Sequence, residues 1–434
     1  MDYNQSENEI SFNCTLPRDI TENQWNFYYA FVWIVEGVSS VLVGCFGICF
    51  NFMTIGVVLS SELSTCFFNW LLVSLCVFDS FFLLCGILEA FRSHLGSTNI
   101  HTYIFVVFLY PFRSVVMFCS IYTTMMLALE RYNALTKPLA NQVSAAQPGR
   151  QTLMAHFRIH SLRLLKYIGP IVMASVIFYI PRQFELEIKS ENGSYNNEYE
   201  ITVNALRNNN HYNLWYLNIS NFLVTIVIPL VTLIYLNANI YIKFKEFLQR
   251  QPSMRTASSN DTNYRITHKR DKDTIQQTKV LFSVAIMFGM FHFLRMILNV
   301  EELLTLEIRR MARNKGCEWL QYWTIISAPV SHLLLQINSS INVFIYCYFN
   351  KLFRDRLSFW FASIQNFLKI KRDLEEETNE NGHTAERNQQ LQPQIESEME
   401  GIVLAEEIID ETVSQSYITE NLSRNKNSEF PTHV

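Results

Sequence analysis

The 434-residue chain lacks the residue spacings that mark most enzyme and metal sites. It contains no Cys-x-x-Cys and no His-Glu-x-x-His, so the sequence predicts no metal site. No nucleophile, base and orienting group can be placed together, which argues against an enzyme. No basic segment interleaved with aromatic residues suggests a nucleic-acid partner. The N-terminus has no basic stretch before a short apolar core, so we expect no cleaved signal peptide.

Apolar sequence is what the chain has in abundance, since 49% of its residues are hydrophobic and 14% are aromatic. The mean hydropathy is +0.08 even though the C-terminal tail is very polar. The apolar residues fall into seven runs, each long enough to cross a bilayer, which takes about 20 residues. These runs cover residues 30–59, 66–91, 105–138, 164–184, 214–242, 280–300 and 319–348.

The predicted fold is therefore an all-α membrane protein, a seven-transmembrane helix bundle occupying residues 30–349. Residues 1–29 form an extracellular tail in this interpretation. Residues 350–370 carry apolar side chains at helical spacing between lysines and arginines, which predicts a short amphipathic helix in the membrane surface. Residues 371–434 are acidic and polar with few aromatics, which predicts a disordered cytoplasmic tail.

Lysine and arginine residues predict the orientation, because they accumulate in cytoplasmic loops. They cluster after the third, fifth and seventh runs, which places those segments inside the cell. A smaller basic group, in the loop placed outside, goes against the rule: Arg309, Arg310, Arg313 and Lys315. Asn-x-Ser/Thr sequences begin at Asn4, Asn13 and Asn192, and they are glycosylation acceptors if extracellular. We expect a multi-pass plasma-membrane protein with its N-terminus outside.

Cysteine usage leaves one candidate disulfide. Seven of the nine cysteines lie in or beside the apolar runs, where a free cysteine acts as a small hydrophobe. Only Cys14 and Cys317 lie in segments placed outside the cell. They pair across the outer face or both stay free, and the sequence supplies no geometry to decide.

Polar residues inside the apolar runs are the main indication of function, because a charge in a membrane span is costly. The second run contains Asp79, the third contains Arg113, and Glu130-Arg131-Tyr132 ends the third. The uncharged polar residues that stand out in the runs are Asn51, Ser120, Asn338, Ser339 and Asn342. Each alone is explained as a contact between helices. As a set they can converge on Asp79 and compensate its charge, directly or with a cation.

These motifs resemble the pattern of rhodopsin-like (class A) G-protein-coupled receptors. Glu130-Arg131-Tyr132, Asn51, Asp79 and the segment 342–346 (NVFIY) lie on four runs in the family's order, and the resemblance covers about residues 30–368. Within the family the chain looks most like invertebrate FMRFamide-type neuropeptide receptors. That likeness is carried by 179–185 (YIPRQFE), 206–209 (LRNN), 236–241 (LNANIY) and 337–347 (INSSINVFIYC).

The resemblance implies roles for particular residues. Glu130 would hold Arg131 in the inactive receptor, and Arg131 would be released toward a heterotrimeric G protein on activation, with Tyr132, Asn342 and Tyr346 in the same switch. A sodium ion, the one cofactor implied, would favour the inactive state in a pocket formed by Asp79, Ser120, Asn338, Ser339 and Asn342. Such two-state elements respond to a ligand through its differential affinity.

The chain also departs from the family. Val106 stands where a cysteine is usual and residues 186–213 contain none, so the usual disulfide of the second outer loop is absent. Leu294 and Val343 replace two usual prolines, Asn237 replaces a usual tyrosine, and the fourth run lacks its tryptophan. These departures leave constitutive activity open.

Ligands of this family enter from outside, between the third, fifth, sixth and seventh spans. The candidate contacts here are Glu89, Tyr110, Arg113, His292, Arg295, Glu301, Glu302 and Trp323. In one interpretation Glu89 or Glu302 pairs with the arginine of an amidated Arg-Phe peptide, and aromatic side chains take its phenylalanine. In the other, Glu89 pairs with Arg113 and Glu301 with Arg295, and the ligand contacts backbone and apolar groups.

The C-terminal tail suggests two further partners. Serines and threonines among the acidic residues 406–420 are phosphorylation candidates that a basic arrestin surface could read, although such residues often carry no function. Thr432 and Val434 match the pattern of C-termini that add a strand to a PDZ-type groove.

The leading hypothesis is a receptor for an extracellular FMRFamide-like peptide that activates heterotrimeric G proteins. An orphan or chemosensory receptor of the same class, for another ligand, is the alternative within the family. A seven-span transporter is the alternative outside it, but the charges form no continuous relay and no inverted repeat is visible. A retinal-linked pigment is unsupported because residues 319–348 contain no lysine.

Overall fold

The computed structural model describes residues 21–59, 67–94, 98–136, 153–190, 199–254, 262–314 and 321–349, with single positions and short pieces between 351 and 372. The chain divides into two units, Met1–Arg354 and Asp355–Val434. The positions described between 351 and 372 are helical, and the predicted amphipathic helix stays a prediction. Several predicted features lie outside the described residues, namely Asn4, Asn13, Asn192, Cys14, Cys317, Thr432, Val434 and the tail 373–434.

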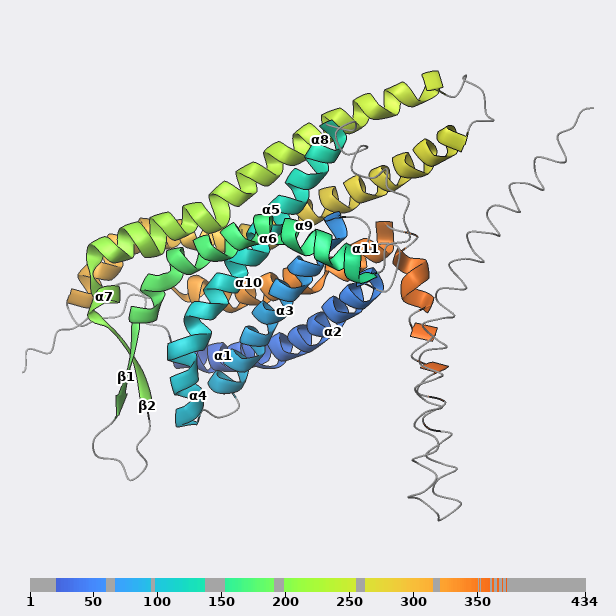
Figure 1. Cartoon of the computed structure of the whole chain (residues 1–434). Helices are drawn as coiled ribbons and strands as arrows, with labels where there is room; N and C mark the ends of the chain where they lie inside the picture. The colour runs from blue at the N-terminus through green and yellow to red at the C-terminus, as the bar shows by residue number, and fades with distance from the viewer. Residues whose placement is uncertain are drawn as a thin grey trace, which may run out of the picture. The chain divides into compact units, whose positions relative to one another are not determined.

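The first unit is built mainly from long helices (Figure 1). Helices α1 (Glu22–Val32) and α2 (Ser40–Leu59) are joined by the π-helical segment η1 (Trp33–Ser39). Next come α3 (Phe67–His94), α4 (Asn99–Ile104), η3 (Phe105–Leu109), α5 (Tyr110–Thr136), α6 (Leu153–Tyr179) and η4 (Ile180–Phe184). The later elements are α7 (Ala205–Asn208), η5 (Tyr212–Ser220), η6 (Leu223–Val227), α8 (Ile228–Met254), α9 (Thr262–Asn314), α10 (Tyr322–Ser340) and α11 (Asn342–Phe349).

Within the described part of the chain, six helical stretches are long and apolar enough to cross a membrane. They are Asn23–Leu59, Phe67–His94, Asn99–Asn133, Ser161–Phe184, Tyr212–Lys243 and Phe282–Arg309. The predicted seventh span is divided at Ile341 into α10 and α11. Helix α10 carries His332, Gln336 and Asn338, which lower its hydropathy below that of the other spans.

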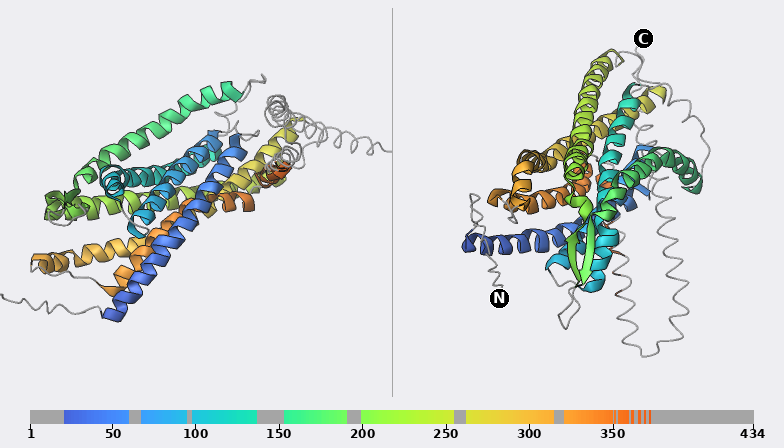
Figure 2. Two further views of the ribbon diagram at one scale, coloured as in Figure 1. Left: turned by 90° about the horizontal axis from the view of Figure 1, so that it is seen from below. Right: turned by 90° about the vertical axis from the view of Figure 1, so that its left-hand side faces the viewer.

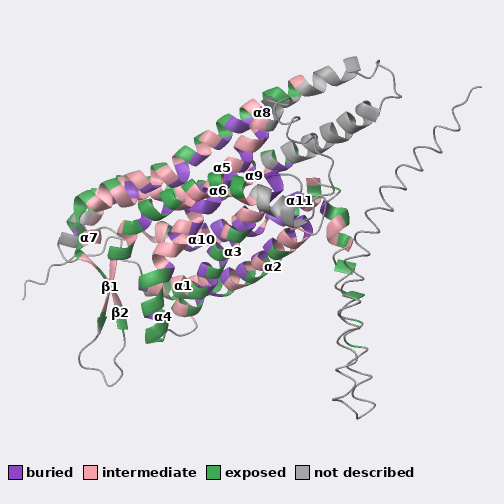
Figure 3. Ribbon diagram, in the orientation of Figure 1, coloured by how far each residue is buried: buried purple, intermediate pink, exposed green. Residues whose placement is uncertain are grey.

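Large apolar side chains on the outer faces of the bundle are exposed (Figure 3). Leu42, Met173, Ile177, Val231 and Ile234 are examples from three different spans. A water-soluble protein rarely exposes large contiguous apolar patches. Lipid tails would cover these faces, while each helix satisfies its own backbone groups.

The inner faces pack closely where small residues allow it. A Cβ atom on Gly47 of α2 would overlap Ser340 Oγ of α10 and come within 2.7 Å of a Leu83 methyl carbon in α3. A Cβ atom on Gly44 would lie 2.6 Å from Ile87 Cγ1. Glycines on one helix face let membrane helices approach to backbone contact. They bring α2, α3 and α10 together, with Leu83 of this contact lying one helical turn along α3 from Asp79.

A two-stranded antiparallel sheet interrupts the helical fold between α6 and α8. Strands β1 (Leu186–Ser190) and β2 (Tyr199–Val203) pair with Leu186 opposite Val203 and Ile188 opposite Ile201. Apolar and polar residues alternate along both strands, the period of two expected of a half-buried strand. The hairpin, α4 and α7 lie at one end of the bundle (Figures 1 and 2). The sequence places this end outside the cell.

Candidate functional site

Among the described residues, one polar region inside the bundle surrounds Asp79 and another lies nearer the hairpin end. The Asp79 side chain of α3 is 1% exposed. Ser120 of α5 donates a hydrogen bond to Asp79 Oδ1 at 2.6 Å, and Asn342 Nδ2 of α11 donates to Oδ2 at 2.9 Å. A buried carboxylate is costly unless it is hydrogen-bonded. The structure therefore brings three of the predicted polar residues, from three spans, into one contact.

A small cavity of about 10 Å³ lies beside this carboxylate, and Asp79, Ser120, Asn338 and Asn342 line it. That volume accommodates about one water molecule or small ion. Carboxylate, hydroxyl and amide oxygens are the ligands that hard cations prefer, so the donor set fits the sodium ion that the family resemblance implies. Asn51 instead donates to the Ser339 carbonyl at 3.3 Å and ties α2 to α10.

The Glu130-Arg131 pair lies at the opposite end of α5 from the hairpin. Glu130 forms an ion pair with Arg163 of α6 at 3.6 Å. The Arg131 guanidinium carbon lies 3.8 Å from the centroid of the Phe68 ring in α3. The structure thus places each member of the pair against a neighbouring span. The expected hold of Glu130 on Arg131 stays a prediction.

Tyr346 and Asn342 connect this end to the Asp79 region. Both lie on α11, one helical turn apart, and both are buried. The Tyr346 ring packs against Phe353, with 5.9 Å between the ring centroids. Tyr132 follows Arg131 on α5 and is half-buried. A rigid shift of α11 would move the Asp79 hydrogen bond and the Tyr346 ring together.

A larger polar cavity of about 110 Å³ lies between η1, α2, α3, α5 and α10, nearer the hairpin end. Its polar lining includes Glu36, Ser40, Glu89, Arg113, His332 and Gln336. Glu36, Ser40, His332 and Gln336 were missed from the sequence. Each is a polar residue in an apolar run, so the criterion that selected Asp79 would have found them.

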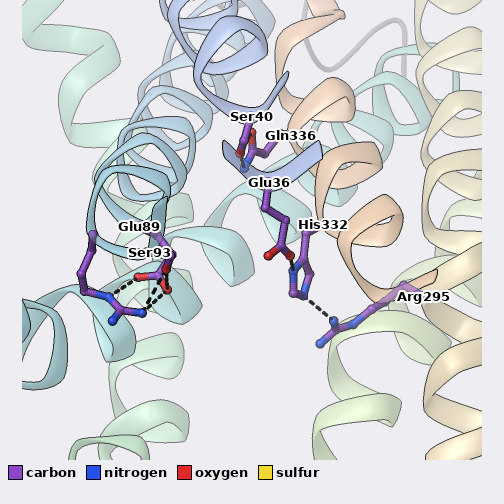
Figure 4. Close-up of polar contacts among 8 residues, drawn as sticks. Glu36, Ser40, Glu89, Ser93, Arg295, His332 and Gln336 are labelled. Atoms are coloured by element: carbon purple, nitrogen blue, oxygen red, sulfur yellow. Dashed lines mark hydrogen bonds and ion pairs between the residues drawn. The ribbon is translucent and has the colours of Figure 1, made fainter. Parts of the chain in front are cut away.

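Two side chains on this cavity, Glu36 and His332, form a relay with Arg295 across three spans (Figure 4). Arg295 Nη1 of α9 lies 3.5 Å from His332 Nε2, and His332 Nδ1 lies 2.8 Å from Glu36 Oε1. A guanidinium only donates hydrogen bonds, so His332 accepts at Nε2 and carries its proton at Nδ1. The neutral imidazole then donates to Glu36. The relay joins the first, sixth and seventh spans.

The predicted internal ion pairs are wrong, because both acids have other partners. Glu89 accepts a bidentate interaction from Arg92, with Nη2 at 2.6 Å and Nε at 3.1 Å. Glu301 pairs with Arg309 at 2.8 Å and not with Arg295. Arg113 makes no hydrogen bond or ion pair with any other described residue, and its guanidinium carbon lies 5.5 Å from the Phe82 ring centroid. Arg92 pairs with Glu89 because residues three apart are neighbours on a helix surface.

The remaining ligand candidates lie away from this cavity. His292 of α9 is buried, and its Nδ1 lies 3.0 Å from the Phe288 carbonyl oxygen in its own helix. The Tyr110 hydroxyl donates a hydrogen bond to Glu185, the residue directly before β1. Trp323 donates to Gln321 near the start of α10. Of the candidate set, the structure places only Glu89 and Arg113 on the cavity, with Arg295 joined to it through His332. Glu301 and Glu302, like Tyr110, His292 and Trp323, do not line it.

Comparison with known proteins agrees with this architecture. Residues 50–346 match the family model described as 7 transmembrane receptor (rhodopsin family). A "FMRFamide receptor" of Drosophila melanogaster is 26% identical over 330 residues, which cover 74% of this chain and 52% of that protein. The chain thus spans about half the length of the curated relative that it matches. The family consists of receptors, not enzymes. With Asp79, Ser120 and Asn342 joined across three spans, and the family model matching most of the chain, this protein belongs to the rhodopsin family of seven-transmembrane receptors.

Proposed function

We propose that this receptor is activated from outside the cell by an amidated peptide of the FMRFamide type and signals through a heterotrimeric G protein. The observation that carries the proposal is the polar cavity at the hairpin end, which brings two carboxylates and an arginine together inside a membrane bundle. The likeness to a receptor named for FMRFamide supports the choice of peptide. Intramembrane charges of this kind usually mark a binding site.

The size of the cavity limits what enters it. A volume of about 110 Å³ is well below the roughly 300–1,000 Å³ of a pocket that encloses a drug-sized ligand. A cavity of about 150 Å³ holds one benzene molecule. The cavity therefore takes one small group of a peptide, such as a guanidinium or a terminal amide, and the rest of the peptide contacts the outer surface near the hairpin. This suits a ligand recognised through its last one or two residues.

The charges on the cavity match an Arg-Phe-amide end. Glu89 is held by an ion pair within one helix turn, an interaction worth only about 0.5 kcal/mol. A ligand guanidinium can replace Arg92 at Glu89 for that small cost. Arg113 is left to donate to a carbonyl oxygen of the peptide, such as that of the terminal amide.

Activation follows the family's logic in this proposal. Ligand contact with the Glu36–His332–Arg295 relay shifts the first, sixth and seventh spans against one another. The shift reaches Asp79 through Asn342, and Arg131 then turns from Phe68 toward the G protein. A sodium ion beside Asp79 stabilises the resting arrangement. Arrestin and PDZ-type partners, the Cys14–Cys317 disulfide, the glycosylation sites and the outward N-terminus remain predictions.

The test is a second-messenger screen in cells that express the full chain, against amidated Arg-Phe peptides. The same peptides with a free C-terminal acid test the amide, and Arg131→Ala is the control for coupling. A dose-dependent response to the amide, lost in Arg131→Ala at equal surface density, supports the proposal. No response to any peptide at good surface density rejects the peptide class.

A further inference from the structure

The β1–β2 hairpin is joined to the bundle by the main chain at its two ends and by no disulfide. No cysteine occurs anywhere between Cys119 and Cys317, so a disulfide cannot attach residues 186–203 to another segment. The hairpin is also too small to be stable alone, since isolated two-stranded hairpins are marginal in water. Its position over the outer ends of the spans therefore depends on non-covalent contacts.

Glu185, the residue before β1, supplies the most deeply buried of these contacts. Its side chain is fully buried, with 0% exposure. Tyr212 of η5 donates a hydrogen bond to Glu185 Oε1 at 2.8 Å, and Tyr110 of α5 donates to Oε2 at 2.5 Å. Arg207 of α7 lies 4.0 Å from Oε2. One carboxylate thus joins the third span, the fifth span and α7.

The backbone of Glu185 closes the base of the hairpin as well. Its carbonyl accepts a hydrogen bond from the Asn204 N–H at 2.9 Å, directly after β2 ends. The main chain of this residue ties the two strands together, while its side chain ties their base to the spans. Two weaker attachments flank it, Gln183 Nε2 to the Val107 carbonyl at 2.8 Å and the Tyr199 N–H to Asn99 Oδ1 at 3.1 Å.

We propose that Glu185 is a positioning residue that clamps the hairpin onto the outer ends of the third and fifth spans, as a disulfide would. A buried carboxylate that keeps two hydroxyl donors is stable in place, whereas removing a donor leaves a buried acceptor unpaired. The two hydroxyl donors therefore stabilise the attachment of the hairpin together, and the loss of either one weakens it. The clamp holds the rim past which a ligand enters, and this last step rests on the proposed function.

The first experiment measures the clamp without any ligand. Hydrogen–deuterium exchange of the full-length purified receptor is followed in peptides that cover residues 185–190 and 199–209. Glu185→Ala and the milder Tyr212→Phe should each speed exchange in both peptides about tenfold or more, which corresponds to about 1.4 kcal/mol. Glu187→Gln is the matched control, because it removes the charge of a partly exposed carboxylate in the same hairpin that pairs with exposed Lys189. The glutamine oxygen can still accept the long 3.5 Å hydrogen bond from Thr202.

A second arm separates the clamp from the ligand. Half-maximal activation by an amidated Arg-Phe peptide should need about tenfold more peptide in Tyr212→Phe, with unchanged basal signalling and surface density, and no change in Glu187→Gln. If no peptide activates the wild type but exchange responds as expected, the clamp stands and the proposed function fails. Unchanged exchange in Glu185→Ala and Tyr212→Phe overturns the clamp. The clamp is also overturned if dithiothreitol treatment of the wild type speeds hydrogen exchange in the hairpin as much as Glu185→Ala does.

Discussion

The stacking of Arg131 on Phe68 makes basal signalling the sharpest test of the receptor switch. Both side chains are buried, with 6% and 2% exposure, and 3.8 Å separates the guanidinium carbon from the ring centroid. A desolvated cation–π contact of this kind is worth about 2 kcal/mol. Phe68→Leu removes the ring but keeps an apolar side chain of similar burial. If Arg131 leaves Phe68 on activation, the active-to-inactive ratio rises about 30-fold.

That factor is large enough to measure without a ligand. A receptor active about 1% of the time would become active about a fifth of the time. The assay is ligand-independent second-messenger production, divided by surface receptor density. Phe82→Leu is the matched control, since the Phe82 ring is equally buried on the same helix but lies 5.5 Å from Arg113, outside the switch. Equal basal signalling in Phe68→Leu and Phe82→Leu would refute the reasoning.

Three further changes test other parts of the structure. Asp79→Asn keeps the shape of the side chain but removes its charge. Its oxygen can still accept from Asn342, while its NH2 group donates to the Ser120 hydroxyl in place of accepting from it. Replacing external sodium with a bulky cation should therefore raise peptide potency severalfold in the wild type and not in the variant; equal shifts would exclude a sodium site. Gly47→Ala forces a methyl group into the α2–α3–α10 contact and should lower the unfolding free energy by about 1–3 kcal/mol, measured by thermal denaturation. Gly169→Ala is the control and should show no such loss, because its added methyl group meets its neighbours at ordinary contact distances. Glu36→Gln and His332→Ala should each weaken peptide potency about tenfold. The double variant should lose little more potency, because the two residues act as one relay. If the two losses of potency add up in the double variant, the residues act separately.

Much of the fold could be predicted because a membrane span is a local property of the sequence. A run of about 20 apolar residues is recognisable wherever it packs, and six of the seven predicted runs coincide with span-length helices. The seventh run is not among these helices, because it is divided at Ile341 and the polar residues of α10 lower its hydropathy. The extensions of α8 and α9 past the predicted spans were missed because their sequences contain few apolar residues. The β1–β2 hairpin was missed because each strand is only five residues long, too short for its alternation to stand out from an ordinary loop.

The sequence by itself determined the family, the number of apolar runs and the presence of costly charges such as Asp79 and Arg113 within them. Only the tertiary structure decided which partners those charges have. Glu36 and His332 are 296 residues apart, and Tyr110 and Glu185 are 75 apart, so no spacing rule connects them. Such contacts form only once the helices pack, as Gly47 lets α2 pack on α3 and α10. A buried polar group must then bond to whatever donor that packing brings within reach.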